Sequence, residues 1–340
     1  MRHEHDHDQN EESARANNRD AVELPQEEPA AASRKSIPLR GAWATHAALV
    51  LVQFAFASQA VEAKLAMMPR ALGGEEIFPE ALAMIRMLGG ALFFQAILRL
   101  RKTTATPIAR ADHARLAGLS VIGIALNQTL FLMGLRWTTP FSASILGATI
   151  PIFAAALAVL FGKEKLSWRT VAGLSLALLG ALSLVGNGSL DRGAILVALN
   201  SLSYAAYVVL SRDVVLRVGA LRAIAWIFTY AALLFLPFGL RALLAQLPAL
   251  TPRGWMFALY ILALPTITAY LLNAWALARS SATLVTVYIY LQPVIAALLA
   301  WAQLGHGISR RAGLAAVLIL VGLGVVASRQ PAKLRVDSPS

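Results

Sequence analysis

Residues 134–167 read GLRWTTPFSASILGATIPIFAAALAVLFGKEKLS, and residues 276–309 read ALARSSATLVTVYIYLQPVIAALLAWAQLGHGIS. The two stretches align without a gap, and the alignment places Pro151 on Pro293. Each copy holds two long apolar segments around a short loop. A repeat of membrane-length segments is typical of duplicated transporters, whose substrate sites lie where the two halves meet.

The composition indicates an integral membrane protein. Hydrophobic residues make up 58% of the chain and charged residues only 14%, which excludes an ordinary soluble domain. A helix needs about 20 mostly apolar residues to cross roughly 30 Å of hydrocarbon. The sequence predicts an all-α protein with ten such helices, near 43–66, 81–99, 114–134, 141–161, 170–187, 193–211, 221–240, 254–274, 283–303 and 311–328.

The chain divides into two tails and two halves. Residues 1–42 are polar and charged, and we expect them to form a disordered cytoplasmic tail. His3, His5 and His7 alternate with acids there, a pattern that binds metal in some proteins but is more often solvated, so no metal site is predicted. The expected five-helix repeats are 43–187 and 193–328, followed by a cytoplasmic tail at 329–340.

Lysine and arginine set the orientation. Most of those outside the apolar segments fall on the side of the N-terminus, so both termini are predicted to be cytoplasmic. With five helices in each half, the second copy enters from the opposite face, which makes the halves inverted repeats around a shared cavity. The net charge of +12 reflects these basic loops, whose natural partners are anionic lipid headgroups and not nucleic acid. A monomer or a homodimer is expected.

Several local motifs carry a family resemblance over roughly 43–328. They are Ala63-Lys64-Leu65, Ile85-Arg86, the polar turn at 138–142, the helix with Pro151, the stretch Gly162-Lys163-Glu164-Lys165-Leu166-Ser167, and the glycines Gly173 and Gly180. With these the chain resembles the drug/metabolite transporter superfamily, in particular its ten-helix EamA-type members. The resemblance implies transport of small organic metabolites, amino acids or drugs, commonly outward in bacteria. The second copy departs from the pattern, because His306 stands where the family usually repeats the glutamate seen here as Glu164.

Two cations lie inside apolar segments, where burial of charge is costly and often functional. Lys64 ends the first predicted helix, and Arg86 lies about two turns into the second. Arg86 is a candidate receptor for a substrate carboxylate or phosphate. The alternative is that these cations pair with Glu62 and Glu80 or extend to the headgroups.

The sixth predicted helix carries a polar stripe. Asn200, Tyr204, Tyr207 and Ser211 follow at spacings that place them on one helix face, which cannot favourably face lipid. They are expected to orient a substrate in the bundle interior or, alternatively, to form helix contacts.

The remaining candidates are spread over other helices. The full predicted substrate-binding set is Arg86, Tyr204, Tyr207, Tyr288, Gln292, Asn200, Asn127 and Asn273; Gln128, Tyr270, Gln53 and Gln59 are weaker candidates. The cavity they are expected to line lies between the first, third, fourth, sixth, eighth and ninth helices. Pro151 and Pro293 are predicted to kink or gate their helices, because each frees a backbone carbonyl, although they could be packing features only.

The centres of the predicted helices lack the acidic residues that proton coupling commonly uses. No Asp or Glu falls in the central part of any predicted helix, and a proton-coupled carrier commonly uses a buried carboxylate. We therefore expect a facilitator or exchanger, with Glu62, Lys64 and Glu164 as coupling candidates. Proton-coupled multidrug efflux is the alternative mechanism.

An enzyme is the competing class. The chain has no cysteine, and outside the tail its histidines are His46, His113 and His306, none beside an acid in a recognised motif. No nucleotide-phosphate loop is found, so no cofactor and no catalytic residue is predicted. An intramembrane enzyme or a receptor remains the alternative class. The expected location is the cytoplasmic (inner) membrane of a bacterium.

Overall fold

The computed structural model describes residues 39–101, 107–138, 140–165, 167–183, 192–304 and 310–327. Apart from 39–42, which begin the first helix, both predicted tails lie outside these residues, and so does His306. Within the described ranges all regular secondary structure is helical, which confirms the predicted all-α class. Six helical stretches in them are long and apolar enough to cross a membrane, namely Trp43–Met67, Pro79–Leu100, Arg110–Trp137, Arg192–Val218, Ala220–Ala249 and Pro252–Leu277.

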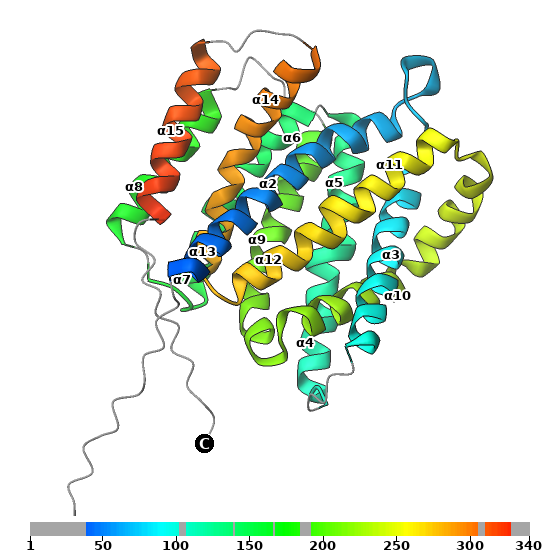
Figure 1. Ribbon diagram of the computed structural model, residues 1–340, viewed down its shortest axis with the longest axis horizontal. Helices are drawn as coiled ribbons and strands as arrows, with labels where there is room; N and C mark the ends of the chain where they lie inside the picture. The colour runs from blue at the N-terminus through cyan, green and yellow to red at the C-terminus, as the bar shows by residue number, and fades with distance from the viewer. Residues whose placement is uncertain are drawn as a thin grey trace, which may run out of the picture. The chain divides into compact units, whose positions relative to one another are not determined.

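The helices follow the order of the two sequence copies (Figure 1). The first copy contains α2 (Leu39–Met67), α3 (Pro79–Leu100), α4 (Arg110–Ser120), α5 (Leu126–Trp137), α6 (Pro140–Gly147), α7 (Ile150–Leu160) and α8 (Trp168–Ser183). The second contains α9 (Arg192–Val218), α10 (Ala220–Gln246), α11 (Pro252–Leu262), α12 (Ala269–Leu277), α13 (Ala282–Val287), α14 (Leu291–Leu304) and α15 (Arg310–Ala327). Helices are favoured because each backbone group in lipid must be satisfied within its own segment.

One helical stretch in each copy contains a wide turn. The π-helical segment η2 (Val121–Ala125) joins α4 to α5, and η4 (Ala263–Thr268) joins α11 to α12. If the offset of the repeat is continued toward the N-terminus, Val121 corresponds to Ala263, so the two segments begin at equivalent positions. Hydroxyl groups compensate for the altered backbone pairing in η4, where Thr266 Oγ1 donates to Ile261 O at 2.8 Å. Such segments are frequent at functional sites.

A second pair of stretches is interrupted where single helices at 141–161 and 283–303 were predicted. Helix α6 ends at Gly147 and α7 begins at Ile150, while the 3₁₀ turn η5 (Tyr288–Tyr290) separates α13 from α14. Each interruption lies just before Pro151 or Pro293, because proline has no N–H to continue the helical ladder. The two interruptions thus lie beside the two prolines at which a kink or gate was predicted.

The helices of the two copies pack against one another in matching pairs. Helix α3 packs on α10 and α8 on α15, and both pairs are visible side by side in Figure 1. Helix α5 packs on α9, and the equivalent α12 packs on α2. Large apolar side chains such as Leu92, Leu233 and Phe238 stay exposed on the outside, as expected for a surface covered by lipid. The length, composition and surface of these helices describe a multi-pass membrane protein.

Candidate substrate cavity

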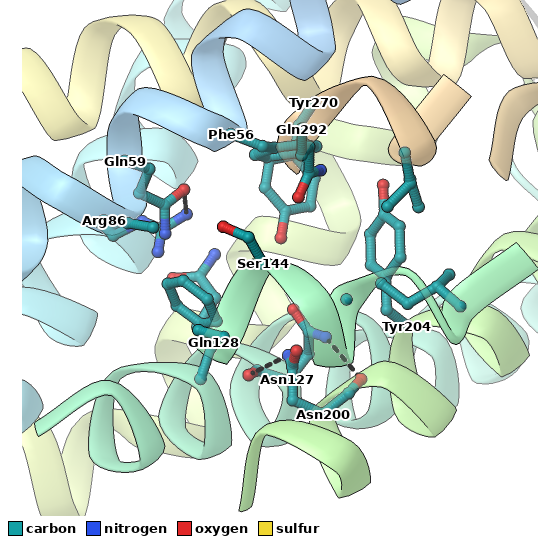
Figure 2. A pocket seen from close by; sticks show the side chains of 16 residues that line it. Phe56, Gln59, Arg86, Asn127, Gln128, Ser144, Asn200, Tyr204, Tyr270 and Gln292 are labelled. Atoms are coloured by element: carbon teal, nitrogen blue, oxygen red, sulfur yellow. Dashed lines mark hydrogen bonds between the residues drawn. The ribbon is translucent and has the colours of Figure 1, made fainter. Parts of the chain in front are cut away.

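A small cavity of about 80 Å³ lies among helices of both copies (Figure 2). It is lined by Phe56, Gln59, Ala60, Arg86, Asn127, Gln128, Phe131, Ala143, Ser144, Gly147, Ile150, Asn200, Tyr204, Tyr270, Ile289 and Gln292. These residues come from α2, α3, α5, α6, α7, α9, α12, η5 and α14. Arg86 is the one charged residue among them, and aromatic and amide side chains form most of the remainder.

The two interrupted helices contribute equivalent residues to this cavity. Gly147 aligns with Ile289 in the repeat and Ile150 aligns with Gln292, and all four are lining residues. A Cβ atom placed on Gly147 would lie 3.7 Å from the Oε1 atom of Gln292. The interruption in the first copy therefore faces the interruption in the second copy across the cavity.

Arg86 is held by neutral groups. Its side chain is buried, with 2% of the residue exposed. The Nε atom donates to Thr266 Oγ1 at 2.8 Å, and Nη2 donates to Gln59 Oε1 at 3.2 Å. No carboxylate of the described residues lies within ion-pair distance of Arg86, so the pairing with Glu62 or Glu80 considered from the sequence is not observed.

Gln128 presents an unsatisfied amide to the cavity. The residue is buried, and neither its Oε1 nor its Nε2 atom has a hydrogen-bond partner among the described residues. The Tyr270 hydroxyl is the close polar neighbour of this amide, near enough for a weak interaction but outside full hydrogen-bond geometry. A buried amide without partners costs free energy, so a ligand that satisfies both of its atoms gains a binding contribution here.

Asn127 and Asn200 bind each other's backbone (Figure 2). The Asn127 Nδ2 atom donates to Asn200 O at 3.3 Å, and the Asn200 Nδ2 atom donates to Asn127 O at 2.9 Å. This reciprocal pair joins α5 to α9, that is, one copy to the other. Both residues line the cavity, and at the same time they make the helix contact that was the alternative interpretation of the α9 stripe.

The tyrosines divide between the cavity and the surrounding packing. Tyr204 lines the cavity, and its hydroxyl accepts a hydrogen bond from Asn273 Nδ2 at 3.0 Å. Tyr207 packs beside the Tyr204 ring and against Gly123, whose missing side chain leaves room for it. Tyr288 hydrogen-bonds to His46.

The cavity thus brings together part of the predicted binding set. Arg86, Tyr204, Gln292, Asn200 and Asn127 line it, whereas Tyr207, Tyr288 and Asn273 are not among its lining residues. Gln292 donates to Gln53 Oε1 at 2.8 Å. Gln59, Gln128 and Tyr270, the weaker candidates, line the cavity, and Phe56, Phe131, Ser144 and Ile150 were not predicted at all. The repeat alignment of Ile150 with Gln292 was the available signal for one of these.

Glu164 connects the copies at one end of the bundle. It lies between α7 and α8, and its Oε1 atom accepts hydrogen bonds from the backbone N–H groups of Ala282 at 2.9 Å and Thr283 at 3.4 Å. The Thr283 hydroxyl donates to the other carboxylate oxygen. Glu164 therefore caps the N-terminus of α13, where a carboxylate is stabilised by the free N–H groups and the helix dipole.

Lys64 lies in the last turn of α2 and caps the C-terminus of α5. Its Nζ atom lies 2.8 Å from Leu135 O, 3.0 Å from Arg136 O and 2.7 Å from Thr138 O. Leu135 and Arg136 belong to the last turn of α5 and Thr138 directly follows it, so their carbonyls lack intrahelical donors. Lys64 also lines a second, larger cavity of about 740 Å³ together with Arg136 and residues of the α2–α3 connection.

The second copy repeats this cap with a different residue. Arg212, near the end of α9, donates through Nε to Ser280 O at 3.0 Å. Ser280 aligns with Thr138 in the repeat. A cation on the first helix of each copy thus binds the backbone that leads into the interrupted helix. Glu62, the remaining coupling candidate, is half-buried on α2.

Replacing Lys64 by methionine should lower stability without removing any cavity-lining group of the central site. Hydrogen bonds from a charged donor contribute roughly 1.5–3 kcal/mol, reduced here because the neighbouring cavity can hydrate the carbonyls, so we expect a loss of about 1–3 kcal/mol. The melting temperature of purified protein measures it. Lys64→Arg serves as the control, since it keeps the charge, and an unchanged melting temperature in Lys64→Met would contradict the capping role.

Comparison with known proteins gives the family. The model of the EamA-like transporter family matches residues 43–186 and again residues 191–328, and so covers most of the chain in two copies. The chain belongs to this family. The resemblance seen in the local motifs is thereby confirmed.

Relatives of this EamA-like transporter are themselves named as transporters. An uncharacterized transporter of Archaeoglobus fulgidus is 25% identical over 293 residues, covering 84% of this chain and 98% of that protein. The uncharacterized inner membrane transporter YedA of Escherichia coli is 28% identical over 75% of this chain and 83% of its own length. The uncharacterized transporter YwfM of Bacillus subtilis is 29% identical over 76% and 88%.

A solved crystal structure supports the fold. It superimposes with a TM-score of 0.64 at 18% sequence identity, covering 83% of this chain and 96% of the other. At this identity the similarity concerns the fold alone. Family and relatives together establish a membrane transporter.

Proposed function

We propose that this EamA-like transporter moves small organic metabolites, such as amino acids, outward across the bacterial cytoplasmic membrane by alternating access. The observation that carries the proposal is the cavity between equivalent helix interruptions, with Gly147 and Ile150 of one copy facing Ile289 and Gln292 of the other. Interrupted helices in corresponding positions of two halves are typical of transporter binding sites.

The proposal includes ten membrane helices arranged as inverted repeats. The spans of the first copy are α2, α3, α4 with α5, α6 with α7, and α8, and the second copy repeats them from α9 to α15. Five spans per copy bring the second copy into the membrane from the opposite face. The matching contacts support a two-fold relation, since α4 packs on α10 as α11 packs on α3. The excess of lysine and arginine in the loops on the side of the N-terminus supports a cytoplasmic position for both termini.

The two cavities suggest a path through the protein. Gln59 and Ala60 of α2 line the central cavity, and Lys64 and Met67, one to two turns further along the same helix, line the larger one. In the proposed orientation the larger cavity lies toward the extracytoplasmic side, and Glu164 lies at the cytoplasmic end. This arrangement corresponds to a state closed at the cytoplasmic end.

The lining residues also bear on coupling. Asp and Glu are missing from the sixteen residues around the cavity. A proton-coupled multidrug pump would use an acid there to exchange a proton for a cationic drug, so the cavity favours a facilitator or exchanger of uncharged, zwitterionic or anionic solutes. Catalysis or a receptor function has no comparable support in this site.

Counterflow in liposomes tests the proposal. Purified protein is reconstituted, and a panel of labelled metabolites is measured with and without unlabelled solute inside and with and without a proton gradient. We expect saturable, trans-stimulated flux that does not need the gradient. Flux that depends on the gradient would instead favour proton coupling through Glu62 or Glu164, and flux without saturation or trans-stimulation would contradict a carrier.

A cavity-filling variant sharpens this test. Gly147→Leu places a side chain toward Gln292 without a backbone clash, because a Cβ atom at Gly147 makes only an ordinary contact. We expect flux to fall more than tenfold while the protein remains folded. Gly118→Leu is the matched control, since a Cβ atom there meets no atom within 4 Å. Equal flux in the two variants would show that the solute does not pass through this cavity.

A further inference from the structure

We propose that the central cavity recognises a small monocarboxylate, with Arg86 binding the carboxylate and Gln128 binding a neighbouring hydroxyl or carbonyl group, and that it disfavours solutes with an ammonium group. The inference rests on the proposed function, because it takes the central cavity as the transport site. It narrows the solute class from small organic metabolites to monocarboxylates with one polar substituent, so that 2-hydroxy and 2-oxo acids take the place of the amino acids given above as an example.

Arg86 has donors left for a ligand. A guanidinium carries five N–H donors in a planar fork, and the hydrogen bonds to Thr266 and Gln59 use Nε and one N–H of Nη2. Three donors remain, including both on Nη1. They match the two oxygens of a carboxylate, which guanidinium groups bind in a bidentate manner.

The charge of the cavity selects a monoanion. A buried cation without a counter-ion is costly, and no carboxylate of the described residues pairs with Arg86. A bound carboxylate supplies the missing charge and leaves a neutral pair. A phosphate group carries about −1.5 to −2 charges near neutral pH, which one guanidinium does not balance.

The charge of the cavity also disfavours solutes with an ammonium group. An amino acid bound through its carboxylate would bring a second positive charge into a site lined by no Asp or Glu. That charge would have only amide oxygens, hydroxyls and ring faces as partners in a low-dielectric environment. The 2-hydroxy and 2-oxo acids carry the same carboxylate without this charge.

Gln128 provides the second contact. Neither atom of its amide makes a hydrogen bond of full geometry among the described residues, although the Tyr270 hydroxyl is a close neighbour, and 1% of the residue is exposed. A hydroxyl group can satisfy the amide oxygen as a donor and the amide nitrogen as an acceptor. A ligand without such a group leaves the amide unpaired. Sites built to hydrogen-bond a hydroxyl group bind analogues that lack it much more weakly.

The free volume limits the size of the solute. A water molecule needs about 10–15 Å³ of accessible volume, so the 80 Å³ present correspond to roughly five to eight water-sized groups. Short organic acids of this size fit, and Phe56, Phe131 and Ile150 provide apolar contact for the carbon chain.

The larger cavity has a charge that suits such solutes. Lys64, Arg70 and Arg136 line it, with Glu76 as the single acid among its lining residues. An excess of positive charge around an opening raises the local concentration of anions. An anionic solute would therefore be attracted on the path between the central cavity and this side of the protein.

A series of small ligands of similar size tests the proposal without any mutation. The full-length protein is purified in detergent, and the dissociation constants of lactate, propanoate, lactamide and alanine are measured from thermal shifts. We expect lactate to bind most tightly, propanoate about tenfold more weakly, and lactamide and alanine at least tenfold more weakly than propanoate. Equal affinity for lactate and lactamide, or tighter binding of alanine than of lactate, would overturn the proposal.

Two substitutions separate the two contacts. Arg86→Gln should remove the preference for lactate over lactamide, whereas Arg86→Lys should retain a weaker form of it because the charge remains. Gln128→Leu should reduce the difference between lactate and propanoate to less than threefold and leave the preference for acid over amide intact. Gly118→Ala, remote from the cavity, serves as the control and should preserve the full order of affinities. An unchanged order in Arg86→Gln would exclude this residue as the carboxylate site.

Binding and flux distinguish the two proposals. Carboxylate-selective binding that depends on Arg86, without trans-stimulated flux in liposomes, would support the site and contradict the carrier. Saturable flux with no dependence on a carboxylate or on Arg86 would support the carrier and contradict the site.

Discussion

Valine at position 193 should prevent recovery of the folded protein. Gly193 lies in the first turn of α9, against the last turn of α5. A Cβ atom there would lie 2.4 Å from Gly134 O and 2.8 Å from the backbone nitrogen of Thr138. These are backbone atoms that cannot rotate away, so the two helices would have to separate. Overpacking commonly costs about 1–3 kcal/mol, and a clash with three backbone atoms at the end of α5 is expected to exceed that range.

The yield of monodisperse protein after size-exclusion chromatography measures this effect. Gly118→Val is the matched control, because it introduces the same β-branched residue into a helix where the added Cβ meets no atom within 4 Å. We expect near-normal yield for Gly118→Val and a loss of at least tenfold for Gly193→Val. Similar yields for both variants would mean that α5 and α9 do not approach as closely as described.

Removing the Glu164 carboxylate should open the end of the bundle that we place in the cytoplasm. Glu164→Ala leaves the N–H groups of Ala282 and Thr283 without their acceptor, and an N-cap contributes about 0.5–2 kcal/mol. Because Glu164 and α13 belong to different copies, this free energy acts on the contact between copies. If the cap forms only in the closed state, loss of its roughly 0.5–2 kcal/mol destabilises that state alone. The ratio of open to closed protein then rises roughly 2- to 30-fold.

Cysteine labelling measures this shift. The native chain has no cysteine, so a single introduced thiol reports without background. Ser211→Cys is a near-isosteric reporter, since Ser211 is fully buried on α9, which contacts α13. A membrane-impermeant maleimide applied from the cytoplasmic face should label this cysteine at least twofold faster in the Glu164→Ala background.

Glu80→Ala provides the matched control, because it also removes a glutamate carboxylate, here from the first turn of α3. Labelling in this control should equal that of the Ser211→Cys protein alone. A rate unaffected by Glu164→Ala would show that the cap does not hold the copies together, and a decreased rate would reverse the assigned direction of the change.

The fold was predictable to the extent that it depends on periodic composition. The repeat and the apolar lengths give a helical membrane protein, because lipid leaves the backbone few alternatives. The interruptions before Pro151 and Pro293 were less predictable in detail, since proline is tolerated in membrane helices when neighbours satisfy the freed groups. The π-helical segments have no sequence signal that we recognise, because they depend on hydroxyl contacts such as Thr266 to Ile261.

The cavity was predictable only in part, for a related reason. Polarity marked Arg86, Tyr204 and Gln292 as interior residues, but it could not tell a lining residue from one that bonds to a neighbouring helix. Tyr288 was predicted on the same grounds as Gln292, and its hydroxyl is engaged by His46. Polarity alone gave no basis to separate Gln128 from its neighbour Asn127, whereas the structure distinguishes an amide bound to backbone from one without a hydrogen bond of full geometry.

The caps at Thr138 and Ser280 predict in which direction a substitution shifts the balance between the two access states. Lys64 and Arg212 bind equivalent carbonyls in the two copies, and inversion of the copies would place these carbonyls at opposite membrane faces. Loss of the Lys64 cap would then destabilise the closed arrangement at one membrane face, and loss of the Arg212 cap would destabilise it at the opposite face. Substitutions of Lys64 and of Arg212 should therefore bias the resting protein in opposite directions, and combining them should restore the original balance at a lower overall stability.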